Sequence, residues 1–155
     1  MGVSGSGKTS VGQALAQRLG CPFSDADSFH SDANRAKMAA GIPLTDEDRL
    51  PWLRAIHDAI REVGAHGADH VFACSALKAD YRHILDPRGE CRLVYLRGSA
   101  ELLAERLVGR RGHFFNPALL QSQLDTLEEP GDALIVDIAQ PLPVIVDSLA
   151  EMLGA

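Results

Sequence analysis

The stretch of sequence that decides the fold is Gly2-Val3-Ser4-Gly5-Ser6-Gly7-Lys8-Thr9. It fits the pattern G-x-x-x-x-G-K-[ST], in which glycines let backbone N–H groups turn inward around phosphate oxygens. Apolar residues at helical spacing then predict a helix from about Lys8 to Leu19, ended by Gly20. Because a helix N-terminus adds unpaired donors and partial positive charge, the stretch predicts a nucleotide site. We expect Lys8 at the β- and γ-phosphates of ATP and the Thr9 hydroxyl on Mg²⁺.

Composition bounds the kind of protein. The chain has 155 residues, 46% of them hydrophobic, and a formal net charge of -6. This predicts a single globular domain, residues 1–155, without the overall basic field that a nucleic-acid partner requires. The three cysteines are far apart and suggest neither a zinc site nor a disulfide framework. No apolar run reaches the roughly 20 residues of a membrane helix, so we expect a cytoplasmic protein with no membrane contact.

Strands and helices alternate along the remainder of the chain. Short runs rich in Val, Ile and Leu predict buried strands at 71–74, 93–96 and 134–138. Periodic segments predict helices near 50–63, 79–85, 100–108, 117–127 and 142–153. This alternation predicts an α/β fold of three layers around a parallel sheet. Ligands of such folds bind at the carboxyl ends of the strands.

A pair of carboxylates, Asp25 and Asp27, flanks Ala26 at the end of a short segment, and His30 follows one turn later. Two carboxylates at a strand end can divide the work, one ordering Mg²⁺ and the other accepting a proton from an acceptor hydroxyl. The competing interpretation is an acidic turn that caps the next helix. The phosphate loop nearby favours the catalytic interpretation.

The segment 46–53 allows two interpretations of Arg49. The acidic residues Asp46 and Glu47 suit a helix N-terminus with Pro51 in its first turn, and Arg49 then pairs with one of these acids. Alternatively, its guanidinium is a fork that holds a substrate carboxylate.

Four further basic side chains follow strand ends or helix ends: Lys78, Arg82, Arg106 and Arg110. The first two are candidates for phosphate or substrate contacts, with a solvated loop and helix cap as the alternative. The last two, with Arg111, surround Gly109 and Gly112, and clustered arginines beside glycines are typical of a lid that closes over ATP. We expect that lid at about 109–126, with an exposed helix end as the alternative.

Longer motifs carry a resemblance to a known family. They are D-x-D-x-x-H from Asp25 to His30, N-x-x-K-M-x-x-G-x-P-L-x-D-x-D-R-x-P-W-L from Asn34 to Leu53, CSALK from Cys74 to Lys78, GHFF at 112–115 and DIAQPL at 137–142. With the phosphate loop, they make the chain resemble the bacterial-type gluconokinases, within the shikimate-kinase-like group of P-loop kinases. The resemblance covers essentially the whole chain.

The resemblance implies an ATP- and Mg²⁺-dependent kinase that phosphorylates D-gluconate. It implies that Asp27 accepts the proton and Asp25 helps to hold Mg²⁺, a division that could be reversed. It implies substrate contacts from His30, Arg49, Lys78, Arg82 and His113, catalytic roles for Lys8 and Arg110, and nucleotide contacts from Arg106, Arg110, Gln140 and Pro141. Members of the family are often dimers, so a homodimer is a further expectation.

One departure from the family is expected at the front of the chain. The phosphate loop normally follows a buried strand, and only Met1 precedes Gly2. We expect a short apolar strand to be encoded upstream of Met1.

Other functions stay open from sequence alone. One is another small-molecule kinase, such as a shikimate kinase, and one is an inactive nucleotide-binding module. A GTPase is a third, because Asp86-Pro87-Arg88-Gly89 formally matches D-x-x-G.

Overall fold

The fold is a parallel α/β arrangement, as the sequence predicts. The computed structural model describes residues 1–110 and 116–155. Strand β1 (Phe23–Asp25) pairs in parallel with β2 (Val71–Ala73), and β3 (Val94–Arg97) pairs in parallel with β4 (Leu134–Asp137). Ser24 lies opposite Phe72 in the first pair, and Leu96 lies opposite Val136 in the second. Within each pair, the two strands run in the same direction, so their carboxyl ends lie side by side. The sequence predicts the candidate site residues at these ends.

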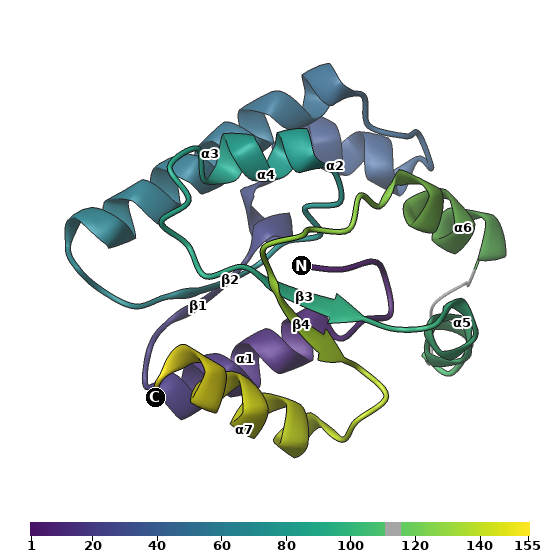
Figure 1. Ribbon diagram of the computed structural model, residues 1–155. Coiled ribbons are helices and arrows are strands. Elements are labelled where there is room, and N and C mark those ends of the chain that lie inside the picture. The colour runs from purple at the N-terminus through teal and green to yellow at the C-terminus, as the bar shows by residue number, and fades with distance from the viewer. Residues whose placement is uncertain (111–115) are drawn as a thin grey trace.

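The first two residues lie between the two strand pairs (Figure 1). The Leu96 N–H donates to the Met1 carbonyl at 2.9 Å, and the Gly2 N–H donates to the Ser75 carbonyl at 3.3 Å. The backbone that leads into the phosphate loop is thus held by β3 on one side and by the end of β2 on the other. The strand expected upstream of Met1 stays a prediction.

Helices cover both sides of the strands (Figure 1). On one side, α1 (Lys8–Leu19) packs against α7 (Leu142–Leu153). On the other side lie α2 (Asp32–Ala39), α3 (Asp46–Ala65) and α4 (Ala79–Leu85), with the short 3₁₀ helix η1 (Ala26–Phe29) leading from β1 to them. The pair α5 (Ala100–Val108) and α6 (Pro117–Thr126) lies beyond the end of β3. None of the helices in the described ranges is both long and apolar enough to cross a membrane.

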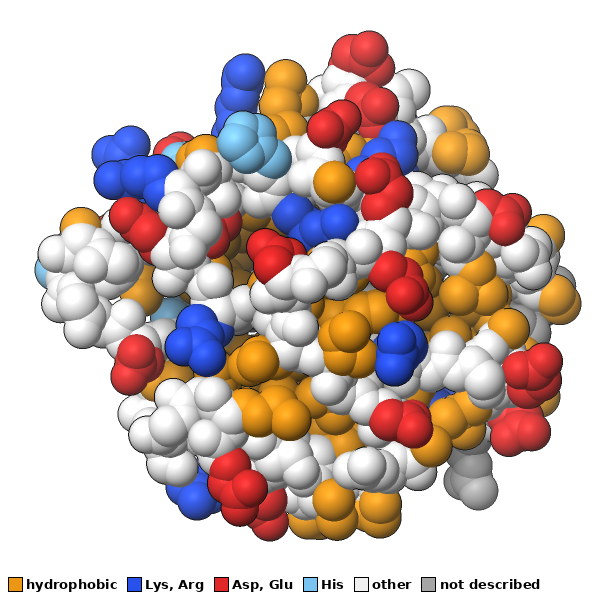
Figure 2. Space-filling model, viewed as in Figure 1, with side chains coloured by type: hydrophobic (Ala, Val, Ile, Leu, Met, Phe, Trp, Pro, Cys, Tyr) orange, Lys and Arg blue, Asp and Glu red, His pale blue; other side chains and the backbone are white. Residues whose placement is uncertain are grey.

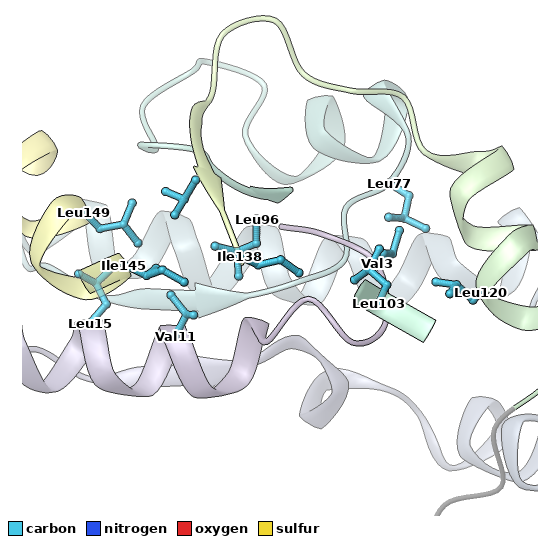
Figure 3. Packing of buried hydrophobic residues seen from close by; sticks show 11 residues of the cluster. Val3, Val11, Leu15, Leu77, Leu96, Leu103, Leu120, Ile138, Ile145 and Leu149 are labelled. Carbon is cyan, nitrogen blue, oxygen red and sulfur yellow. The ribbon is translucent and has the colours of Figure 1, made fainter. Parts of the chain in front are cut away.

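Two apolar clusters hold these layers together. The larger one joins α1 and α7 to the β3–β4 pair, with Leu15, Leu96, Ile138 and Leu149 among its buried members (Figure 3). The smaller one lies under α3 and includes Trp52, Leu53, Ile56 and Leu85. Burying each such side chain stabilises the fold by about 1.5–3 kcal/mol.

Helix α3 begins earlier than the sequence pattern indicates. The Asp48 N–H donates to the Thr45 side chain and the Thr45 N–H to the Asp48 side chain, a capping box that starts the helix at Asp46. The placement of Pro51 in the first turn is therefore wrong, since Pro51 lies inside the helix. Its missing N–H costs one hydrogen bond to the preceding turn, and the helix continues because the capping box and the buried face fix both sides of the interruption.

Candidate active site

The phosphate loop has the conformation that its glycines allow. Gly5 and Gly7 have φ values of 84° and 85°, in the left-handed region that side chains rarely adopt. A Cβ on Gly5 would also lie 3.1 Å from the Leu103 carbonyl oxygen of α5. Gly7 is the N-cap of α1 and offers no side chain to its first N–H groups. Those N–H groups, with the helix dipole behind them, fit a phosphate.

Lys8 lies across the loop, with Nζ 3.1 Å from the Val3 carbonyl oxygen. Burial lowers the pKa of Lys8, and the nearby carboxylates of Asp27 and Asp25 oppose that effect. The charge of Arg110 also acts on the Lys8 pKa, in the lowering direction. Lysine, carboxylates and the arginine at the end of α5 therefore share one electrostatic environment.

Asp25 and Thr9 meet at the edge of the loop. The Thr9 hydroxyl donates to Oδ2 of Asp25 at 2.9 Å, and the Asp27 N–H donates to Oδ1 of Asp25 at 3.0 Å. A hydroxyl and a carboxylate are oxygen ligands of the kind that Mg²⁺ binds, usually with phosphate oxygens and waters completing the shell. No group of three or more His, Cys, Asp or Glu side chains in the described ranges could hold a metal alone. The pair therefore fits a magnesium ion that arrives with a nucleotide.

The Asp27 side chain differs from that of Asp25. It is exposed, and no hydrogen bond engages its carboxylate among the residues that the structure describes. A carboxylate without a hydrogen-bond partner beside the phosphate loop suits the role of proton acceptor better than that of a fixed metal ligand.

His30 is held against the core next to this carboxylate. Its ring stacks on Trp52 with centroids 4.3 Å apart, and Trp52 is fixed by donating from Nε1 to the Ala26 carbonyl at 2.7 Å. Burial lowers the pKa of His30, with the charge of Asp27 opposing and that of Arg49 adding to the decrease. These effects favour the neutral form of the His30 ring.

A second set of polar groups lies where the start of α3 meets the start of α4. Arg49 donates from Nη1 to the Leu44 carbonyl at 2.8 Å, and the same atom lies 3.9 Å from Oδ1 of Asp46. Lys78 Nζ lies 3.5 Å from that carboxylate oxygen, and the Tyr81 hydroxyl donates to it. The structure thus shows the pairing of Arg49 with Asp46, and the role of Arg49 as a fork for a substrate carboxylate stays a prediction.

Two arginines that we predict to contact a ligand, Arg82 and Arg106, donate to main-chain carbonyls, and their ligand contacts stay predictions. Arg82 donates from Nη1 to the Ala76 carbonyl at 2.8 Å and from Nη2 to the Glu128 carbonyl at 2.9 Å. Arg106 donates to the Ile138 carbonyl, which places it under the loop that carries Gln140. These arginines join loops around the strand ends through main-chain carbonyls.

The remaining predicted residues lie at the rim or outside the description. Arg110 is exposed just after α5, and Gln140 and Pro141 are exposed between β4 and α7. His113 lies outside the described residues. The D-x-x-G match is a turn after α4, in which the Asp86 carboxylate accepts from the N–H groups of Glu90 and Cys91.

Sequence reasoning missed a contact between the phosphate loop and α6. The Ser4 N–H donates to Oε1 of Gln123 at 2.7 Å, and Nε2 of Gln123 donates to the Ser4 hydroxyl at 3.0 Å. The two residues are 119 positions apart, so no local spacing indicates the pair. Tyr81 was also missed as a member of the set of polar groups around Asp46, although the polar run that follows β2 could have indicated it.

Surface charge agrees with a small anionic ligand more than with a polyanion. On the face shown in Figure 2, basic and acidic side chains are interspersed.

The fold and the site together define a P-loop kinase. A family model described as shikimate kinase matches residues 4–133. The thermoresistant gluconokinase of Escherichia coli is 42% identical over 158 residues, which is 99% of this chain and 90% of the relative. The gluconokinase of Gluconobacter oxydans is 50% identical over 135 residues, 85% of this chain and 75% of the relative. A crystal structure of a gluconokinase from Sinorhizobium meliloti has a TM-score of 0.85 and 46% identity, covering 99% of this chain and 93% of that one.

The chain belongs to the gluconokinases within the shikimate-kinase family.

Proposed function

We propose that this protein transfers the γ-phosphoryl group of ATP to the 6-hydroxyl of D-gluconate, giving 6-phospho-D-gluconate and ADP, with Mg²⁺ as cofactor. Membership of a kinase family supports the use of ATP, and the relatives named as gluconokinases support the acceptor.

The observation that carries the proposal is that the charge of Asp27 acts both on Lys8 of the phosphate loop and on His30. The charge of Arg49 also acts on His30, so Arg49 belongs to the same neighbourhood. Arg49 and Lys78 lie together beside Asp46, and their charges suit a carboxylate. An acceptor with a hydroxyl at one end and a carboxylate at the other can therefore place the hydroxyl at Asp27.

The residues of the site would divide the work of binding and catalysis. The first N–H groups of α1 and Lys8 hold the β- and γ-phosphates, while Thr9 and Asp25 hold Mg²⁺. When bound, the metal neutralises charge on the transferring phosphoryl group. The Asp27 carboxylate takes the proton that leaves the 6-hydroxyl oxygen as that oxygen bonds to phosphorus. Arg49 and Lys78 orient the acceptor, and His30 presents a neutral ring to its hydroxyl groups.

The rim residues complete the nucleotide side. Gln140 and Pro141 lie at the carboxyl end of β4, where such folds bind the base, and Arg106 supports their loop through the Ile138 carbonyl. Arg110 belongs to a lid at about 109–126 that brings positive charge to the phosphates, and the contact of Gln123 with Ser4 supports a connection between that region and the loop.

Steady-state ADP release, with and without D-gluconate and with and without Mg²⁺, tests this function. We expect release only when both are present, and a decrease in kcat of about 10²–10³ for Lys8→Ala, the scale of losing one charge-stabilising donor. Equal turnover with glucose, which has no carboxylate, would contradict the assignment of gluconate. Light scattering on the same preparation tests the expected homodimer.

A further inference from the structure

The Asp46 carboxylate lies where three donors from other parts of the sequence converge. The Tyr81 hydroxyl donates to its Oδ1, Lys78 Nζ lies 3.5 Å from that oxygen, and Arg49 Nη1 lies 3.9 Å from it. The ring of Tyr81 is also close to both cations, with its centroid 5.3 Å from Lys78 Nζ and 5.9 Å from Arg49 Cζ. Attraction of both cations to the ring helps to keep them facing the same point.

The three donors are less exposed than the carboxylate they surround. The side chain of Asp46 is 63% exposed, against 33% for Arg49 and 36% for Lys78. Arg49 is also held in place by the bond from its Nη1 to the Leu44 carbonyl. The two cations are therefore more firmly held than the Asp46 carboxylate, which is the part that faces water and can leave.

Asp46 can leave without disturbing the helix that it begins. Helix α3 is started by the reciprocal bonds between Thr45 and Asp48, and neither bond uses the Asp46 side chain. Exposed ion pairs contribute little to stability, because water screens them and two long side chains must be ordered. An arriving carboxylate can replace Asp46 at small cost.

We propose that Arg49, Lys78 and Tyr81 form the cradle for the carboxylate of the acceptor, and that Asp46 occupies this cradle as an internal competitor until the acceptor displaces it. The idea rests on the proposed function, since it takes the acceptor to be an aldonate. It assigns Tyr81 as a third carboxylate contact and Asp46 as a residue that sets specificity. A carboxylate can exchange for Asp46 on the cations, whereas a neutral polyol cannot.

Two other roles of Asp46 predict the opposite result. If Asp46 positions the two cations for the substrate, its removal releases them and weakens binding. If Asp46 binds a hydroxyl of the acceptor directly, its removal also weakens binding. Competition alone predicts tighter binding after the charge is removed.

The decisive variant is Asp46→Asn, which keeps the size of the side chain and removes its charge. We expect the gluconate KM, and the Kd measured by calorimetry with a non-hydrolysable ATP analogue present, to fall by roughly two- to tenfold. The effect should appear in KM and Kd rather than in kcat. The matched control is Glu47→Gln, which removes the same charge one residue away, where no hydrogen bond or ion pair with the cradle occurs in the described ranges, and should change neither constant.

The neutral polyol sorbitol and a second variant complete the test. Asp46→Asn should leave the weak affinity for sorbitol unchanged, and Tyr81→Phe, which keeps the ring but removes the hydroxyl, should weaken gluconate binding severalfold. An unchanged or raised gluconate Kd in Asp46→Asn would overturn the proposal. Turnover of gluconate by the wild-type protein reports on the proposed function, while the ratio of Kd values reports on the cradle, so the two claims fail separately. Absence of gluconate binding by the wild-type protein would overturn both.

Discussion

The hydroxyl of Thr9 and the carboxylate of Asp25 are joined by a hydrogen bond of 2.9 Å. Thr9 lies in the first turn of α1 and Asp25 is the last residue of β1. The bond brings two oxygen ligands from different elements to one point beside the phosphate loop. It also distinguishes the two neighbouring acids, because the Asp25 carboxylate accepts hydrogen bonds and the Asp27 carboxylate accepts none from the residues that the structure describes.

Asp25→Asn should therefore change the response to metal. The amide keeps the size of the side chain but removes the charge that attracts Mg²⁺. Loss of a supporting metal contact typically lowers metal affinity by about 10–100-fold, so we expect the Mg²⁺ concentration that gives half-maximal rate to rise by about the same factor. The measurement is a magnesium titration of ADP release at saturating gluconate. An unchanged half-maximal Mg²⁺ concentration would show that Asp25 does not hold the metal.

Asp27→Asn should affect the chemical step. Removing a general base typically costs roughly 10²–10⁴ in kcat, and the amide can still accept hydrogen bonds from the substrate. We expect kcat to fall on this scale while the gluconate KM changes severalfold at most. A raised KM with unchanged kcat would make Asp27 a binding residue.

Arg82→Met should lower stability more than it affects catalysis. The guanidinium donates to carbonyls of the loop after β2 and to the Glu128 carbonyl beyond α6, and their loss leaves acceptors without partners. We expect a loss of about 1–3 kcal/mol in the free energy of unfolding, measured by urea denaturation. A rise in the gluconate KM without loss of stability would instead support a direct contact with substrate.

Asp48→Asn should alter the dependence of stability on pH. The hydrogen bond from Lys37, at 2.7 Å, and that from the Thr45 N–H lower the pKa of Asp48 to about 2, below its ordinary value of 3.8. A carboxyl group with a lowered folded-state pKa stabilises the fold above its unfolded-state pKa and loses that contribution as pH falls toward the folded-state value. Urea midpoints of the wild-type protein should therefore fall more steeply between pH 4 and pH 2 than those of the variant. Parallel curves would show that this carboxylate does not contribute.

The bounds of some helices could be predicted from the sequence and those of others could not. Helix α1 could be predicted with its bounds, because Gly7 and Gly20 mark its two ends locally. The start of α3 could not, since the capping box of Thr45 and Asp48 competes with the stronger helix-start signal of Pro51. Two conflicting local signals are resolved only by the hydrogen bonds that form.

The candidate site shows the same limit. Lys8, Thr9 and the two acids could be predicted to lie near one another from spacing, because they belong to the loop or lie at the end of β1. The partners of an arginine could not be predicted, because a guanidinium group can donate equally well to a ligand or to a main-chain carbonyl. Arg82 and Arg106 donate to carbonyls. The bonds between Ser4 and Gln123 join distant segments, and only the fold brings them together.

The position of the transferred phosphoryl group tests the central claim most directly. The reaction of ATP, Mg²⁺ and D-gluconate with this protein can be followed by two-dimensional proton–phosphorus NMR, which identifies the carbon that carries the new ester. We predict a single phosphate ester correlated to the methylene protons of C6, formed in equal amount to ADP. An ester at another carbon, or free phosphate with unmodified gluconate, would contradict the account.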